Sequence, residues 1–269
     1  MEIAKAEKQN IQTDYKAVTE LALLTGEILL SCGADTRRAE DTMEYIMNTL
    51  TGGTFVVSVL SASIFASFTP DDGNMPVTMM HKINSWSSNM TNVHIANDTS
   101  RKFCAGEISV YDAIEILKKA KNSVNKTIWQ CLAGYMLTTA FIPLFTPDNL
   151  WNVPIAAICG LFLGLVAFLF RKVQIKDFFV NIIMSFTAAL IAFAATFLFR
   201  VGANMGVIVA ACICPMFPGV NIVNAVRDIF HGDYISGSGR LLEAIIKTVG
   251  IALGAIGGTS VVIFILMKM

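Results

Sequence analysis

The chain has 269 residues, of which 54% are hydrophobic and 15% are charged. A typical soluble domain has about 25% charged residues. The 20 basic and 20 acidic side chains cancel, so no global positive field attracts nucleic acid. This composition excludes a disordered protein and argues against an ordinary cytosolic enzyme.

The charged residues divide the chain into two parts. Residues 1–127 hold 27 charged side chains, whereas residues 128–269 hold only 13. We therefore expect a soluble domain over 1–127 and a transmembrane domain over 128–269. The first residues are polar and carry both charge signs, which predicts no secretory signal and a cytosolic first domain.

The first part is predicted to be an α+β domain. Apolar residues recur with helical spacing over 14–30, and Gly33 ends that helix. Asp35 or Thr36 caps a second helix, which extends to about residue 50. The remaining expected elements are three strands of a small antiparallel sheet, over 54–60, 63–69 and 76–83, and two helices, over 93–105 and 110–121.

Five apolar stretches follow, and each is long enough to cross a bilayer, which takes about 20 residues. The expected fold class is therefore an α+β soluble domain followed by an all-α polytopic membrane domain. One of the five helices is broken by proline and glycine. The expected spans cover about 128–145, 153–170, 178–199, 201–230 with a break at 215–219, and 241–267.

Basic residues in the short loops predict the orientation, because cytoplasmic loops carry an excess of Lys and Arg. Nine lie on the side of the N-terminal domain and two on the opposite side. We expect a multi-pass membrane protein with its N-terminal domain in the cytosol. The nine are Lys118, Lys119, Lys121, Lys126, Arg171, Lys172, Lys176, Arg227 and Arg240, and the two are Arg200 and Lys268.

The most specific stretch interrupts the fourth apolar segment. Pro215, Pro218 and Gly219 end or kink a helix near the bilayer centre. Irregular backbone at that depth is tolerated only where protein or a watery cavity covers it. A helix that restarts there points N–H groups at an anion, which suits a solute that carries a carboxylate. A packing kink that binds nothing is the alternative.

Polar residues after the break complete a candidate substrate-binding or gating site. The amides offer neutral hydrogen bonds, and Arg227 offers a cation. The carboxylates relay protons in one interpretation and form salt bridges with the two arginines in the other. The glycine- and serine-rich stretch 231–240 is expected to be a loop. The polar set is Asn221, Asn224, Arg227, Asp228, Asp233 and Arg240.

Two further patterns have structural interpretations. Gly250 and Gly254 have the small-x-x-x-small spacing that predicts close packing against another helix, in this chain or in a partner subunit. Gly33, Arg38 and Glu40 combine a turn with charges at a helix start. Helix capping and a salt bridge between Arg38 and Glu40 explain this motif as well as a binding site would.

The sequence shows no nucleophile–base spacing, phosphate-binding loop or metal-ligand pattern. We therefore predict no catalytic residue, no metal and no cofactor, and a protein that is not an enzyme.

Two motifs together resemble the signatures of the threonine/serine exporter family, in the same order and over nearly the whole chain. The first is CGADTRRAEDTM and the second is PGVNIVNAVRDIFHGDYISGSGRLLEA. The second matches a PG pair, then N-A-x-R-D, then G-D-x-x-S-G and R. The matching positions are Arg38, Glu40, Pro218, Gly219, Asn224, Arg227, Asp228, Gly232, Asp233, Gly237 and Arg240.

The resemblance implies a transporter. Long members of the family carry more membrane helices and export threonine and serine. Short, YjjP-type members resemble only the N-terminal portion, work with a small separate membrane partner and are associated with export of succinate or related dicarboxylates. This chain looks like the short type.

We therefore expect an ion-gradient-driven transporter subunit that exports a small carboxylate-bearing metabolite together with such a partner. A homo-oligomer is the alternative assembly. A membrane-tethered hydrolase and a non-transporting scaffold for a partner membrane protein are the alternative functions.

Overall fold

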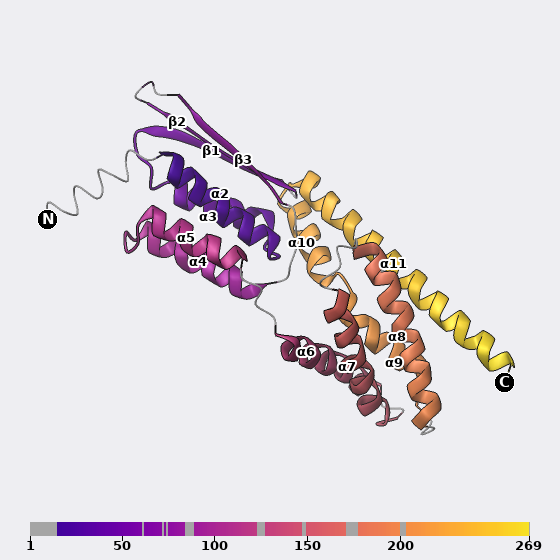
Figure 1. The fold of residues 1–269 in the computed structure, drawn as a ribbon. Coiled ribbons are helices and arrows are strands. Elements are labelled where there is room, and N and C mark those ends of the chain that lie inside the picture. The colour runs from indigo at the N-terminus through magenta and orange to yellow at the C-terminus, as the bar shows by residue number, and fades with distance from the viewer. Residues whose placement is uncertain are drawn as a thin grey trace. The chain divides into compact units, whose positions relative to one another are not determined.

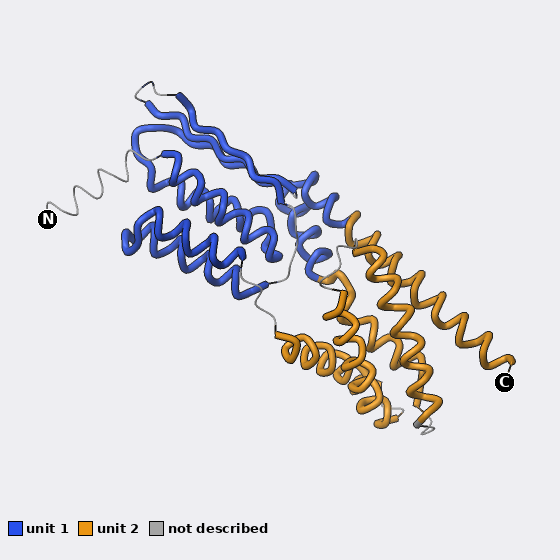
Figure 2. The backbone as a smooth tube through the Cα atoms, in the orientation of Figure 1, with its two compact units in different colours: residues 1–124, 220–241 blue, residues 125–219, 242–269 orange. Residues whose placement is uncertain are grey.

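The computed structural model describes residues 15–60, 62–71, 73, 75–83, 89–122, 127–146, 149–170, 177–199 and 203–268. The contacts group the chain into two compact units, 1–124 with 220–241 and 125–219 with 242–269 (Figure 2). The expected division into soluble and membrane domains at residue 127 stays a prediction. Outside the described residues lie five of the basic positions used for orientation, Lys126, Arg171, Lys172, Lys176 and Arg200.

The first unit has three layers (Figure 1). The antiparallel sheet, of order β1-β2-β3, packs on a helix pair formed by α2 and α3. On the other side of that pair lie α4 and α5. The bounds are α2 Tyr15–Ser31, α3 Thr36–Met47, β1 Gly53–Leu60, β2 Ser63–Pro70, β3 Val77–Lys82, α4 Met90–Cys104 and α5 Val110–Asn122. These elements agree with the predicted α+β fold and with the predicted order.

The central strand anchors the sheet on the helices. Ile64, Ala66 and Phe68 of β2 alternate with more exposed residues and are completely buried. The register places Phe68 between Phe55 of β1 and Val77 of β3. The buried apolar side chains of the sheet therefore lie on the face that covers α2 and α3, whereas Val56, Phe65 and Met80 are exposed on the other face.

Helix α2 lies between the sheet and the outer helices, so most of its surface is buried. Glu27 is one of its buried residues, and a buried carboxylate needs partners. His81 Nδ1 on β3 lies 3.1 Å from one carboxylate oxygen, and Lys121 Nζ on α5 lies 2.6 Å from the other. This single side chain therefore ties the middle layer to both neighbouring layers.

The second unit is helical. Four described helices are long and apolar enough to cross a membrane, and a fifth span results if α9 with η2 and α10 are counted as one broken span. This number and the break agree with the predicted spans. The bounds of the remaining elements are α6 Ile128–Phe141, η1 Ile142–Phe145, α7 Asn152–Phe170, α8 Asp177–Phe199, α9 Met205–Ile213, η2 Cys214–Met216, α10 Gly219–Phe230 and α11 Tyr234–Lys268. Of these, α10 after Gly219 and α11 as far as Leu241 belong to the first unit.

The loop expected over 231–240 is mostly absent. Helix α11 begins already at Tyr234, so the prediction is wrong for residues 234–240. Gly237 is the reason, because a Cβ atom at this position would lie only 2.9 Å from the carbonyl oxygen of Ala225 on α10. Here glycine permits close helix packing and does not end a helix.

The glycines of α11 pack against α8, as their spacing predicts. A Cβ atom at Gly250 would lie 3.0 Å from the carbonyl oxygen of Phe178, and one at Gly258 would lie 2.8 Å from that of Phe186. At Gly254 it would collide with the Ile182 carbonyl. The helix partner in the described chain is therefore α8.

This packing predicts different effects for two neighbouring glycines. We expect Gly254→Ala to force α8 and α11 apart and to lower the free energy of unfolding by about 1–3 kcal/mol, as overpacking does. Gly257→Ala is the matched control, because its Cβ would meet only the ring of Phe186 at 3.6 Å. Thermal unfolding in detergent compares the two. Equal melting temperatures would show that the helices do not pack through Gly254.

Candidate functional site

The turn between α2 and α3 carries the first motif. Gly33 has a φ of 101°, a conformation that favours glycine, and the N–H of Ala34 donates to the carbonyl of Leu29 at 2.9 Å. Asp35 then caps α3, because its carboxylate accepts a hydrogen bond from the N–H of Arg38 at 2.7 Å. The predicted helix end at Gly33 and the predicted cap at Asp35 are both confirmed.

The second motif forms a similar corner between α10 and α11. Gly232 has a φ of 92°, and the N–H of Asp233 donates to the carbonyl of Asp228 at 2.9 Å. Helix α10 therefore ends in the same way as α2. The close approach at Gly237 then holds the first turn of α11 against α10.

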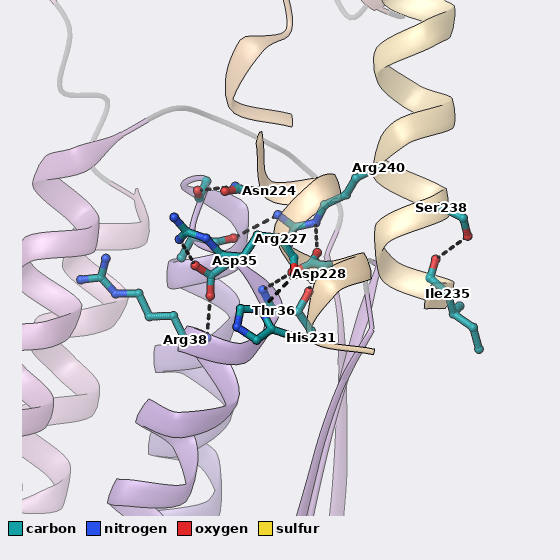
Figure 3. Close-up of polar contacts among 12 residues, drawn as sticks. Asp35, Thr36, Arg38, Asn224, Arg227, Asp228, His231, Ile235, Ser238 and Arg240 are labelled. Atoms are coloured by element: carbon teal, nitrogen blue, oxygen red, sulfur yellow. Dashed lines mark hydrogen bonds and ion pairs between the residues drawn. The ribbon is translucent and has the colours of Figure 1, made fainter. Parts of the chain in front are cut away.

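The two motifs meet within the first unit (Figure 3). The carboxylate of Asp228 accepts hydrogen bonds from the N–H of Thr36 at 3.2 Å and from its hydroxyl at 3.0 Å, across 192 positions of sequence. The Nε of Arg240 lies 3.3 Å from the same carboxylate, and its Nη1 donates to the carbonyl of Ala34 at 3.1 Å. Thr36, Asp228 and Arg240 are all buried.

Two more side chains of α10 reach the same turn. The amide of Asn224 donates to the carbonyl of Gly33 at 2.9 Å, and Nη1 of Arg227 donates to the carboxylate of Asp35 at 2.5 Å. Burial opposes ionisation of Asp35, but the hydrogen bonds from Arg227 and from the N–H of Arg38 outweigh it and hold the pKa of this carboxyl below its ordinary value.

We call this set the two-motif network. It comprises Gly33, Ala34, Asp35, Thr36, Asn224, Arg227, Asp228 and Arg240. Of the expected salt bridges, the one between Asp228 and Arg240 is present, whereas Arg227 pairs with Asp35.

The other predicted site residues are divided between the units. Asn221 lies half-buried on the first turn of α10, and Asp233 lies at the corner that precedes α11. Pro215 lies in η2, Pro218 precedes α10 and Gly219 is its first residue, and these three belong to the second unit. A role of the whole set in binding or gating stays a prediction.

Arg38 and Glu40 do not form the expected salt bridge with each other. Glu40 Oε1 instead accepts a hydrogen bond at 2.8 Å from the N–H of Val59 on β1. The guanidinium of Arg38 points away from the two-motif network (Figure 3). Burial raises the pKa of Glu40, the Val59 N–H opposes this shift, and the nearby charge of Asp233 adds to it.

Because the pKa of Glu40 is raised in the folded protein, its ionised form costs stability near neutral pH. We expect Glu40→Gln to raise the melting temperature at pH 7, since the amide oxygen still accepts from Val59 without a charge. The gain should vanish below the unfolded-state pKa of glutamate, where both states are protonated. Glu40→Ala is the control, because it loses the hydrogen bond and about 0.5–1.5 kcal/mol.

Sequence reasoning treated Asp35 and Thr36 only as helix caps and did not predict their contacts with α10. Their partners, Arg227 and Asp228, lie in the second motif. The occurrence of both motifs in one family signature is the signal that could have predicted contact between them. Within the described ranges, no group of three or more His, Cys, Asp or Glu side chains is placed to hold a metal ion.

The two-motif network joins two segments of the first unit that are distant in sequence. Its buried polar groups bind one another and fix α10 and the start of α11 to the α2–α3 turn. Arg227 is more exposed than Thr36, Asp228 and Arg240, because about half of its side chain is accessible to solvent.

The chain is similar to known exporters. A family model described as "Putative threonine/serine exporter" (ThrE) matches residues 20–262. The "Probable threonine/serine exporter" of Mycobacterium tuberculosis is 20% identical over 240 residues, which cover 89% of this chain and 45% of the relative. The "Threonine/serine exporter" of Corynebacterium glutamicum is 24% identical over 254 residues, which cover 90% of this chain and 51% of the relative.

No solved structure shows a significant match to the chain. The chain spans about half the length of the two curated relatives. The matched region extends from α2 into α11 and includes both motifs of the network. The chain therefore belongs to the threonine/serine exporter family, ThrE.

Proposed function

We propose that the chain is a transporter subunit, and not an enzyme, that exports a small carboxylate-bearing metabolite. The observation that carries this proposal is the family match over 20–262, which includes the broken pair of α9 with η2 and α10. The names of both relatives favour threonine or serine as the solute, and a succinate-like dicarboxylate is the second candidate.

The solute is proposed to bind at the break between η2 and α10. Pro218 has no N–H, and the N–H of Gly219 donates to the carbonyl of Phe217 at 2.8 Å, so the backbone here is not that of a continuous helix. Such a break in a membrane span offers carbonyl groups and N–H groups to a solute.

The two-motif network is proposed to gate this site. Asn224, Arg227 and Asp228 follow the break within α10, and their polar groups already bind the α2–α3 turn. Movement of α10 on solute binding would therefore strain or release the network. Arg240 extends the same connection to the first turns of α11.

The proposed setting is the bacterial cytoplasmic membrane, with the N-terminal domain in the cytosol and an ion gradient as the energy source. A small integral-membrane partner subunit is proposed to complete the pathway, because alternating access commonly uses paired repeats. A homo-oligomer is the alternative assembly.

Efflux from reconstituted vesicles tests the function. The full chain is reconstituted with and without its partner, and efflux of labelled threonine, serine and succinate is measured under proton and sodium gradients. We expect gradient-dependent efflux of one solute class, and more of it with the partner present. No flux of any of the three under either gradient would contradict the transporter proposal.

Pro218→Ala tests the solute site in the same assay. We expect a large loss of efflux at an unchanged amount in the membrane, because alanine lets η2 and α10 join into a helix that satisfies its own hydrogen bonds. Thr146→Ala, in the segment after η1, is the control. Wild-type efflux from Pro218→Ala would place the site elsewhere.

A further inference from the structure

A polar groove lies between α3 and α4 in the first unit, and none of its lining residues belongs to the two-motif network. Its volume is about 460 Å³, within the range of small-molecule sites. Every lining residue carries a polar or charged group, while apolar atoms contribute slightly more than half of the exposed lining, so the groove suits a small ligand with both polar and apolar parts. The groove is lined by Arg38, Asp41, Thr42 and Tyr45 on α3, and by Asn97, Ser100 and Arg101 on α4.

The two arginines of the groove, Arg38 and Arg101, make no direct ion pair with any described residue. Arg227 and Arg240 of the same unit, in contrast, both bind carboxylates. Two guanidinium groups beside one groove provide the planar donors that recognise a carboxylate. Asp41 adds one negative charge to the same lining.

We propose that this groove binds a small polar α-amino acid. Arg38 and Arg101 hold its carboxylate, and Asp41 holds its ammonium group. The side chains of Thr42 and Asn97 offer hydrogen bonds to a hydroxyl on the ligand. A dicarboxylate fits less well, because it has no positive group to place beside Asp41.

Arg38 connects the groove with the two-motif network. Its side chain lines the groove, while its backbone N–H donates to Asp35, the partner of Arg227. A ligand that binds Arg38 therefore acts on the first turn of α3, beside the contact that holds α10. The inference that the groove senses the exported solute rests on the proposed function, whereas the binding itself does not.

Isothermal titration calorimetry of the purified full chain in detergent tests the binding without any gradient. The probes are L-threonine, L-serine and succinate. We expect both amino acids to bind, and Arg38→Gln and Arg101→Gln each to weaken their affinity at least tenfold. Arg37→Gln is the matched control, because this exposed neighbour on α3 does not line the groove.

Asp41→Asn separates a zwitterion site from a plain anion site. We expect it to weaken the binding of threonine and serine and to strengthen that of succinate, since it removes the ammonium partner and a repelling charge together. Amino-acid binding that is absent, or that survives in both arginine variants, overturns the proposal. Tighter binding of succinate than of either amino acid by the wild type overturns it as well.

Hydrogen exchange tests the connection to the network. Threonine is expected to change the exchange of α10 amides in the wild type and not in Arg38→Gln, and no change in the wild type overturns the sensing role. Efflux in vesicles keeps the two proposals apart. Efflux from a protein that binds no amino acid in the groove overturns only the proposed groove site. Binding in the groove without any efflux contradicts only the proposed transport function.

Discussion

Asp228→Ala is expected to lower the free energy of unfolding by about 3–5 kcal/mol, the usual cost of removing one partner of a buried ion pair. Asp228 is only 1% exposed and its carboxylate accepts two hydrogen bonds from Thr36. It is also the carboxylate partner of Arg240, which is itself 4% exposed. The variant leaves the guanidinium buried without that negative charge.

Two further variants make this result specific. Asp228→Leu combined with Arg240→Met removes both charges, and we expect its stability to lie much closer to that of the wild type. Asp233→Ala removes a less buried carboxylate from the same corner and should change little. Chemical denaturation in detergent measures the free energies, and hydrogen exchange of α3 and α10 locates the loss. If Asp228→Ala were as stable as Asp233→Ala, the network would not hold the corner together.

Asp35→Ala and Arg227→Ala are expected to lower the maximal rate of efflux to the same extent, about tenfold each. A charge-assisted hydrogen bond is worth about 1.5–3 kcal/mol, and the lower end applies because Arg227 is half-exposed. Both variants break the contact between Asp35 and Arg227, and Asp35→Ala also removes the cap of α3, so the double variant should be no worse than Asp35→Ala alone. The solute concentration for half-maximal efflux should stay unchanged.

Direct binding of the solute by Arg227 would give another pattern. Arg227→Ala alone would then raise the half-maximal concentration, by up to about 150-fold, and Asp35→Ala would not. The charge-swapped variant, Asp35→Arg with Arg227→Asp, separates the two cases because it restores an ion pair but not a cation on α10. Recovery of efflux by the swap supports gating, and failure with a changed half-maximal concentration supports binding.

The same contact has a defined pH dependence. The pKa of Asp35 is lowered in the folded protein, so its stabilising contribution is present above the unfolded-state pKa. It is lost only as the pH falls through the lower, folded-state pKa. The contact between Asp35 and Arg227 should therefore persist through mildly acidic conditions.

Local patterns predicted most of the elements. The end of α2 and the start of α3 follow from Gly33 and Asp35, because a glycine past a helix end and an acidic cap act through neighbouring backbone groups. The break before α10 follows from Pro218, whose missing N–H is also a local property. In each case the determining interactions span only a few positions.

The contacts between distant residues could not be predicted in the same way. Nothing near Thr36 indicates that its hydroxyl binds Asp228, since the pair forms only when α10 packs beside the α2–α3 turn. The error over 234–240 has the same origin. Gly237 and its neighbours have the composition of a loop, but the close approach of α10 selects a glycine within a helix. The groove between α3 and α4 likewise arises only from their packing.

Helix α11 continues without interruption over 35 residues, from the corner beside α10 to the glycines that pack on α8. Each residue advances a helix by about 100° around its axis. The four-residue intervals from Gly250 to Gly254 and from Gly254 to Gly258 therefore keep these three glycines on the face of α11 that packs on α8. One residue inserted between two of these glycines would turn one of them about 100° away from α8, although a surface loop would absorb the same insertion. The packing of α11 on α8 therefore requires a fixed number of residues between its glycines. If that number changes, no substitution of a single side chain can recover the packing.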